Sequence, residues 1–224
     1  MSGYLGLIAA SAGFVGSHFA MSHSLRKWMV RTFGQNGFLG VYSIVSVLFL
    51  AMMIIAFRAI PAEAALWSAG DIFWTISSLL TLFSAVLFTG SLIGNPSLPS
   101  PASAELAMRL PSGVFKVTRH PMMWSFALWG VAHILIAPRL DILIFIGSII
   151  FLALVGAWAQ DTKKSNLMGV EWEMWLRRTS FFPRLTGFFK VPILNWIAGI
   201  VLWLAATWAH GYFAVPTAGI FRWF

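Results

Sequence analysis

Six long apolar stretches dominate this sequence, and none of them contains Asp, Glu, Lys or Arg. A helix needs about 20 mostly apolar residues to cross the hydrocarbon core of a bilayer. Only 10% of the residues are charged and the mean hydropathy is +0.82, whereas soluble proteins carry about a quarter charged residues. We therefore predict an all-α membrane protein, a bundle of six transmembrane helices in a single domain over residues 1–224. The expected spans are Tyr4–Ser22, Phe38–Phe57, Ile72–Ile93, Pro121–Ala137, Ile142–Ala159 and Val191–Phe213.

The basic residues fall almost entirely in alternate connections between these spans. Twelve of the 15 Lys and Arg residues lie in the first, third and fifth connections, which the positive-inside rule assigns to the cytoplasmic side. Both termini are then expected to be non-cytoplasmic. The third connection should carry a short helix near Ala102–Leu110. The fifth mixes basic and aromatic residues, as segments at the lipid headgroups do, so the net charge of +8 predicts contacts with membrane lipids and no nucleic acid.

Histidines are the chemically distinctive residues of the predicted spans. The chain has no cysteine, which excludes disulfides and thiolate ligands. His18, His133 and His210 fall inside predicted spans, where an ionisable group is by default a functional candidate. Neutral imidazole suits haem iron, copper or zinc, and a hydrogen-bonded structural histidine is the alternative. A ligand pair must join two helices: His18 with His133, His18 with His120, or His133 with His210.

Arg119, His120 and Pro121 form a second candidate site where the fourth span begins. Proline is favoured at the first position of a helix, and the free amides and dipole of a helix N-terminus attract anions. Arg119 adds a forked donor group. This stretch therefore predicts a contact with lipid phosphate, or a site for a phosphate, carboxylate or propionate group at the cytoplasmic face.

Three stretches resemble the NnrU family of bacterial multi-pass membrane proteins. They are SHFAMSHSLR at 17–26, VTRHPMMWSFALWGVAH at 117–133 and GAWAQDTKKSNLMGVEWEMWLRRTSFFP at 156–183. The resemblance implies a place in the bacterial inner membrane and a link to nitrogen-oxide metabolism, that is, to denitrification. It does not define a reaction.

The family is also similar to the plant 15-cis-ζ-carotene isomerases, which are haem b proteins. By motif, that resemblance implies haem b with His18 and His133 as axial ligands, and Arg119 and His120 steadying propionates or a second ligand. Two strong axial ligands favour electron transfer or a redox-gated role with a redox partner. The isomerases have a cysteine three residues before the second ligand, and this chain has Gly130 there, which argues against a ligand switch of that kind.

A weaker resemblance points to the isoprenylcysteine carboxyl methyltransferases and phospholipid methyltransferases. Their pattern has RHPxY and a pair of glutamates, whereas this chain has RHPMM and Gln160-Asp161. The alternatives to a redox haem protein are therefore a redox-gated polyene cis-trans isomerase, an S-adenosylmethionine-dependent membrane methyltransferase, or a non-catalytic assembly factor. The sequence does not indicate an oligomeric state.

Overall fold

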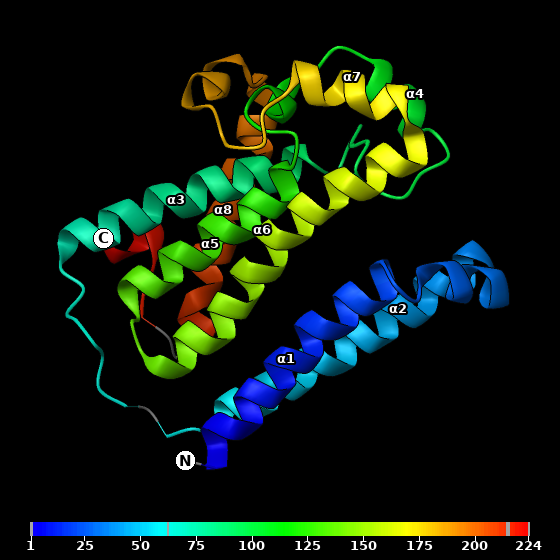
Figure 1. Cartoon of the computed structure of the whole chain (residues 1–224). Helices are drawn as coiled ribbons and strands as arrows, with labels where there is room; N and C mark the ends of the chain where they lie inside the picture. Colours follow the sequence, from blue (N-terminus) through cyan, green and yellow to red (C-terminus); the bar gives the residue numbers. More distant parts are fainter. Residues whose placement is uncertain (1, 62, 214–215, 224) are drawn as a thin grey trace. The chain divides into compact units, whose positions relative to one another are not determined.

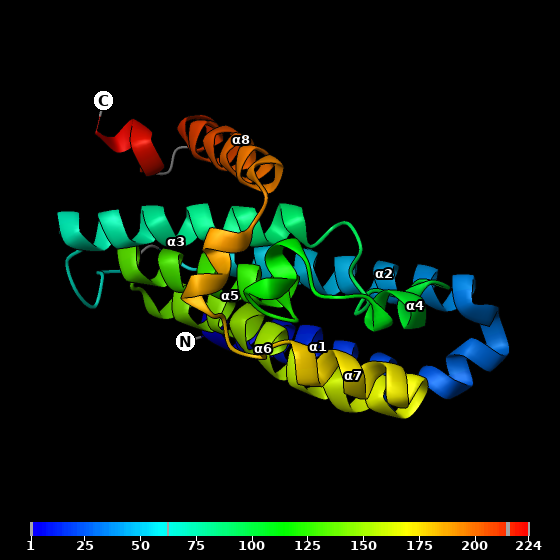
Figure 2. The same ribbon diagram turned by 90° about the horizontal axis from the view of Figure 1, so that it is seen from above.

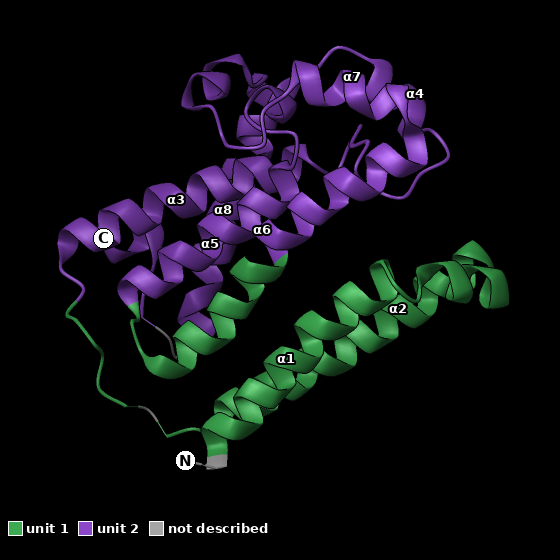
Figure 3. Ribbon diagram, viewed as in Figure 1, with its two compact units in different colours: residues 1–68, 137–152 green, residues 69–136, 153–224 purple. Residues whose placement is uncertain are grey.

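A computed structural model describes residues 2–61, 63–213 and 216–223, and this part of the chain is helical with no strand. It forms two compact units (Figure 3), one of Met1–Ser68 with Ala137–Leu152 and one of Ala69–Ile136 with Ala153–Phe224. Figure 1 shows the helices, and four short 3-10 helices (η) also occur among the described residues. The elements in chain order are α1 (Ser2–Ser22), α2 (Arg26–Arg58), α3 (Asp71–Gly90), α4 (Ser103–Met108), η1 (Gly113–Lys116), α5 (Pro121–Ile136), α6 (Leu140–Met168), α7 (Val170–Arg178), η2 (Leu185–Lys190), α8 (Ile193–Ala209), η3 (His210–Tyr212) and η4 (Gly219–Arg222).

Five helices of the described residues are long and apolar enough to cross a membrane: α1, α2, α3, α6, and α8 together with η3. The expected fourth span corresponds to α5, an apolar helix of 16 residues. At 1.5 Å per residue α5 is about 24 Å long, whereas the hydrocarbon core is about 30 Å thick. An all-helical, membrane-type chain is therefore confirmed, while the count of six spans and the side of the termini stay predictions.

The helix boundaries differ from the predicted spans in two places. Helix α2 starts at Arg26 rather than Phe38, because a preceding helical segment joins it through Gly34, whose φ of 69° and ψ of 174° break the helix there. Figure 2 shows this bend near the N-terminal end of α2. Helix α6 continues past Ala159 to Met168. The short helix predicted in the third connection is present as α4.

The first unit consists of α1, α2 and the first part of α6. Helix α1 packs along α2, and the two run side by side in Figures 1 and 2. Ala10, Phe14 and Met53 form a buried core between them. Phe145 and Ile149 of α6 pack against that core, and the amide of Leu66 donates to the carbonyl of Pro138 at 2.8 Å.

In the second unit, α5 is joined to α3 by two buried side-chain hydrogen bonds. The hydroxyl of Ser77 donates to the carbonyl of Ala132 at 3.0 Å, and the hydroxyl of Ser84 donates to the carbonyl of Ser125 at 2.8 Å. Lipid tails are as apolar as leucine, so membrane helices associate through close packing and such interhelical hydrogen bonds. These bonds fix the position of α5 and of the residues just before it.

Helix α8 packs against α3 through a glycine contact. A Cβ at Gly199 would lie 2.5 Å from Cγ2 and 2.7 Å from Cα of Val86, so the two backbones meet where only glycine fits. One turn further along α8, the indole of Trp203 donates to the hydroxyl of Thr81 at 3.0 Å. The same rule of small residues and polar contacts therefore governs both faces of α3.

A core rich in aromatic residues packs against Val86 and Leu87 of α3 and supports the candidate site. Trp172 and Trp175 of α7 are buried together with Phe115 of η1 and Phe188 of η2. Helices α4 and α7 pack on each other and lie together past the C-terminal end of α6 in Figure 1. The two long connections are therefore folded into ordered structure.

Candidate functional site

The backbone just before α5 is held by the segment that follows α7. The amide of Arg119 donates to the carbonyl of Ser180 at 2.8 Å, and the hydroxyl of Thr118 donates to the carbonyl of Phe181 at 2.6 Å. The indole of Trp124 donates to the same Phe181 carbonyl at 2.8 Å. Two connections that are far apart in sequence thus fix the start of α5.

Asp161 of α6 joins the two predicted site residues in one network. Arg119 donates to Oδ2 of Asp161 from Nε at 2.8 Å and from Nη2 at 2.7 Å, and its guanidinium lies 5.3 Å from the ring centre of Phe181. His120 contacts Oδ1 of Asp161 through Nε2 at 2.8 Å, and its side chain is 0% exposed. A carboxylate only accepts hydrogen bonds, so Nε2 of His120 is the donor, and Nδ1 of the neutral ring is an acceptor.

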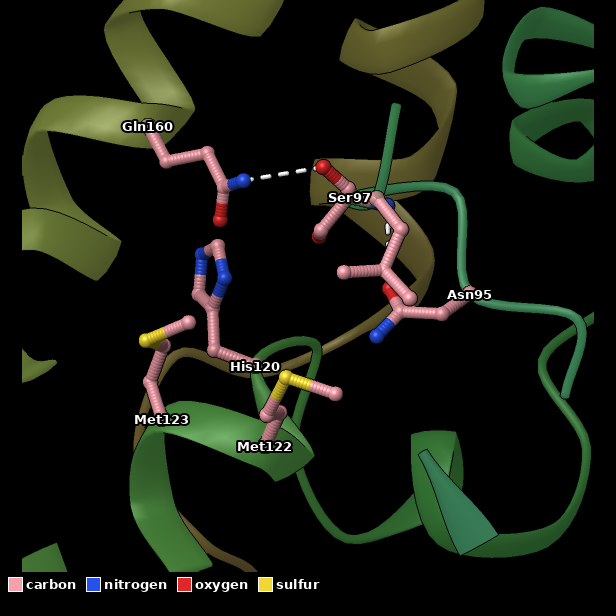
Figure 4. Close-up of a pocket in the computed structure, with 7 residues that line it drawn as sticks. Asn95, Ser97, His120, Met122, Met123 and Gln160 are labelled. Carbon is pink, nitrogen blue, oxygen red and sulfur yellow. Dashed lines mark hydrogen bonds between the residues drawn. The ribbon is translucent and has the colours of Figure 1, made fainter. Parts of the chain in front are cut away.

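A small cavity, with room for about one water-sized group, lies beside the His120 ring. Nδ1 of His120 and Oγ of Ser97 are both buried, and neither has a hydrogen-bond partner within the part of the chain that the structure describes. Figure 4 shows the imidazole between the two methionines, with the serine and asparagine across the cavity. The lining residues are Asn95, Ser97, Leu98, His120, Met122, Met123 and Gln160.

The wall opposite His120 is held in place by polar residues near the end of α6. Gln160 donates from its amide to the carbonyl of Ser97 at 2.9 Å, and the ammonium group of Lys164 donates to the carbonyl of Pro96 at 2.8 Å. Within the wall itself, the amide of Ser97 donates to Oδ1 of Asn95 at 2.9 Å. Gln160 and Lys164 are one helical turn apart, so a single face of α6 fixes this loop.

The structure brings together His133 of α5 and His210 of η3, the short 3-10 helix that continues α8. Their ring centres are 6.3 Å apart with an angle of 30° between the ring planes. Nδ1 of His133 bonds the carbonyl of Trp129 at 2.7 Å, and Nδ1 of His210 bonds the carbonyl of Ala206 at 2.7 Å. A carbonyl is an acceptor, so each Nδ1 carries a proton, and in the neutral ring Nε2 then keeps its lone pair.

His18 of α1 has the same arrangement in the other unit. Its Nδ1 donates to the carbonyl of Phe14 at 2.7 Å. The ring centre lies 4.4 Å from that of Phe14 and 5.3 Å from that of Tyr42. Because His18 belongs to the first unit and His133 to the second, their pairing on one iron stays a prediction.

The histidine sites offer one or two imidazole ligands each. No group of three or more His, Cys, Asp or Glu side chains among the described residues could hold a metal ion. A haem, by contrast, needs only one or two protein ligands, because the macrocycle supplies the others. The histidines of the spans therefore fit a haem better than a bare metal centre.

The predicted site residues did not include Ser97 and Gln160, which line the cavity. They also did not include Asp161, which bonds Arg119 and His120. Asp161 had a signal in the sequence, since it is the first acidic residue after a long apolar run. Ser97 had none, because its loop contains several similar Ser and Pro residues. Only the tertiary bonds from α6 bring this loop to His120.

Comparison with known proteins gives one match. The sequence profile of the family described as "NnrU protein" matches residues 6–217, which is nearly the whole chain. No curated protein and no solved structure matches the chain.

Proposed function

Since this chain belongs to the NnrU family, we propose that it is a multi-pass protein of the bacterial inner membrane that binds haem b through His18 and His133. The haem supplies one-electron chemistry when bound. Held by the imidazoles of His18 and His133, a haem would carry single electrons, so the proposed role is electron transfer or redox gating. We link this role to nitrogen-oxide metabolism and to a redox partner.

The observation that carries this proposal is the state of the two imidazole rings. In both His18 and His133, Nδ1 donates to the backbone carbonyl four residues earlier, at 2.7 Å. Histidines that bind metals almost always donate their other ring N–H to a carbonyl, a carboxylate or water, which fixes the tautomer and the ring orientation. Each ring therefore presents an unprotonated Nε2, the atom that haem iron takes.

The surroundings of each ring restrict its rotation. Trp129 lies with its ring centre 4.4 Å from that of His133, and Phe14 and Tyr42 pack against His18. Apolar neighbours also keep water from the iron, which favours electron transfer over exchange of ligands. These contacts support a pre-oriented ligand on each helix.

The propionate role predicted for Arg119 and His120 has less support. Both side chains already bond Asp161, and the carboxylate offsets the charge of the guanidinium that would attract a propionate. The proposed haem site therefore consists of His18 and His133, without Arg119 and His120.

A second ligand pair is favoured by one observation. His133 and His210 belong to the same unit, and their ring centres are 6.3 Å apart. His133 is common to the two pairs. The second candidate is therefore a haem held by His133 and His210.

The test is the visible spectrum of the detergent-purified protein, oxidised and reduced, with a pyridine haemochrome assay for stoichiometry. We expect a Soret band at about one haem per chain. The band should be lost in His133→Ala and His18→Ala, regained in both on adding imidazole, and kept in His210→Ala. His23→Ala is the matched control, since His23 is exposed at the end of α1, where its ring bonds the Ser22 hydroxyl and lies 6.1 Å from that of Phe19.

Two results would change this proposal. Loss of the band in His210→Ala but not in His18→Ala selects the second pair. A protein that stays colourless after growth with a haem precursor overturns haem binding altogether, and leaves the span histidines with the structural role of joining helix turns.

A further inference from the structure

We propose that the cavity beside His120 binds the hydroxyl group of a neutral amphiphile, an alcohol carried on an apolar chain. The first support is a pair of unsatisfied atoms. Nδ1 of His120 and Oγ of Ser97 are both buried and without a partner in the described residues, and both residues line the same cavity. Buried polar atoms are rarely left unpaired, because the loss of water is not repaid. Two such atoms at one cavity indicate a missing polar ligand.

The hydrogen-bonding roles of these two atoms define the ligand group. Asp161 accepts from Nε2 of His120, so Nδ1 offers a lone pair and needs a donor. Oγ of Ser97 carries a proton that it can donate. A hydroxyl group donates one hydrogen bond and accepts others, so it matches both atoms at once. A carbonyl or carboxylate could not donate to Nδ1, and an ammonium group could not accept from Ser97.

The charge of the site favours a neutral ligand. The seven described residues that line the cavity include no Asp, Glu, Lys or Arg. Three charged residues lie behind the lining. Arg119 and Asp161 bond each other at 2.7 Å, and the ammonium group of Lys164 bonds the carbonyl of Pro96. An ion entering the cavity would lose its water without meeting a counter-charge in the lining, which is unfavourable.

The rest of the lining is apolar and the space is small. Leu98, Met122 and Met123 complete the wall around the polar atoms, as the labelled methionines in Figure 4 show. Methionine side chains adapt to ligands of varied shape. The enclosed space admits about one water-sized group, far less than the roughly 300–1,000 Å³ of pockets for drug-sized ligands. The cavity therefore holds the hydroxyl end of a longer molecule rather than a whole nucleotide cofactor.

The wall is built to stay in place. Gln160 and Lys164 bond successive carbonyls of the loop at Ser97 and Pro96, and Asp161 orients the His120 ring. Binding then costs little ordering of the protein, since the loop and the imidazole are already positioned. This inference stands on the cavity alone and does not depend on haem.

The experiment uses an octanol analogue that carries a photoreactive diazirine, with the full-length protein in a detergent that lacks hydroxyl groups. Sites of labelling are mapped by peptide mass spectrometry. We expect saturable labelling of the peptides that contain Leu98 or Met122. Excess 1-octanol should compete with the label, whereas octane and octanoate should not.

Two variants remove one hydrogen bond each. His120→Gln keeps an N–H for Asp161 and removes the Nδ1 acceptor, and Ser97→Ala removes the donor. Each should weaken labelling about fivefold to tenfold, the size of one net hydrogen bond, while Ser46→Ala, whose hydroxyl bonds Tyr42 in the first unit, should not. The Tm of each variant is measured alongside to show that it is folded. Labelling that is not saturable, that octane competes equally, or that both variants leave unchanged would overturn the proposal and assign the cavity to water.

Discussion

The histidines of the spans donate a hydrogen bond from Nδ1, whereas His120 donates from Nε2. In His18, His133 and His210 the Nδ1 proton is bonded to a carbonyl of the preceding turn, so Nε2 faces outward from the helix. In His120 the Nε2 proton is bonded to Asp161, so Nδ1 is the free atom. The ring nitrogen left without a bonded proton therefore differs between the two groups. It is set by the partner of the other nitrogen, a backbone carbonyl in the spans and Asp161 at the cavity.

Asp161 is the residue whose loss should most disturb the His120 network. In Asp161→Asn, the guanidinium of Arg119 loses its counter-charge. This charge is largely buried, because the side chains of Arg119 and Asp161 are only about 15% exposed. Removing one partner of a buried ion pair costs about 3 kcal/mol or more. We therefore expect a clearly lower Tm for the purified variant, measured from intrinsic fluorescence on heating in detergent.

The matched control for that variant is Glu105→Gln. Glu105 pairs with Arg109 on the exposed surface of α4, where both side chains are more than 60% exposed, and such pairs contribute about 1 kcal/mol at most. Equal Tm losses in the two variants would contradict a special role for Asp161. The comparison separates burial from charge, because both substitutions replace a carboxylate by an amide.

Part of this network could be predicted from the sequence and part could not. Arg119 and His120 are adjacent and precede a proline that starts a helix, so a polar site there followed from local rules. The partner Asp161 is 41 residues away from His120, and its pairing depends on how α6 returns to the start of α5. The contact of His133 with His210 was one of three open pairs, which helix geometry alone did not decide.

At the scale of the elements, apolar runs predicted the helices well and their ends poorly. Charge-free runs fix where a helix lies in lipid, but a helix continues in water when its polar side chains find partners. Helix α6 does this, since Gln160 and Lys164 bond the loop before α4. The kink at Gly34 could not be located either, because several glycines near it fit a helix equally well.

The contact between α3 and α8 gives a prediction at this scale. In Gly199→Ala, the new Cβ would meet the backbone of Val86 at 2.7 Å, and a backbone cannot move aside as a flexible side chain can. Overpacking of this kind costs about 1–3 kcal/mol, so the Tm should fall. In Gly156→Ala the new Cβ meets nothing within 4 Å, so the Tm should stay or rise slightly, as alanine is the better helix former. A Tm drop in both variants, or in neither, would contradict this account of the packing.

For the whole molecule, the bonds of Asp161 bear on how often the chain crosses the membrane. Arg119 and His120 precede α5, and Asp161 lies near the other end of the α5–α6 pair. Their contacts at 2.7–2.8 Å bring the start of α5 next to the last third of α6. We therefore expect the chain to cross the membrane through α5 and to return through α6, although α5 is only 16 residues long.

The absence of cysteine in the chain allows this topology to be tested with single cysteine reporters. Ser68, Ser112 and Thr186 are exposed residues of the second, third and fifth connections. With six spans and non-cytoplasmic termini, a membrane-impermeant maleimide should label Ser68→Cys in intact cells. It should label Ser112→Cys and Thr186→Cys only after the membrane is permeabilised, because the positive-inside rule retains their basic connections in the cytoplasm. If Thr186→Cys reacts in intact cells while Ser112→Cys does not, α5 fails to cross and the chain has five spans. If all three patterns are reversed, the six spans stand and the predicted side of the termini is wrong.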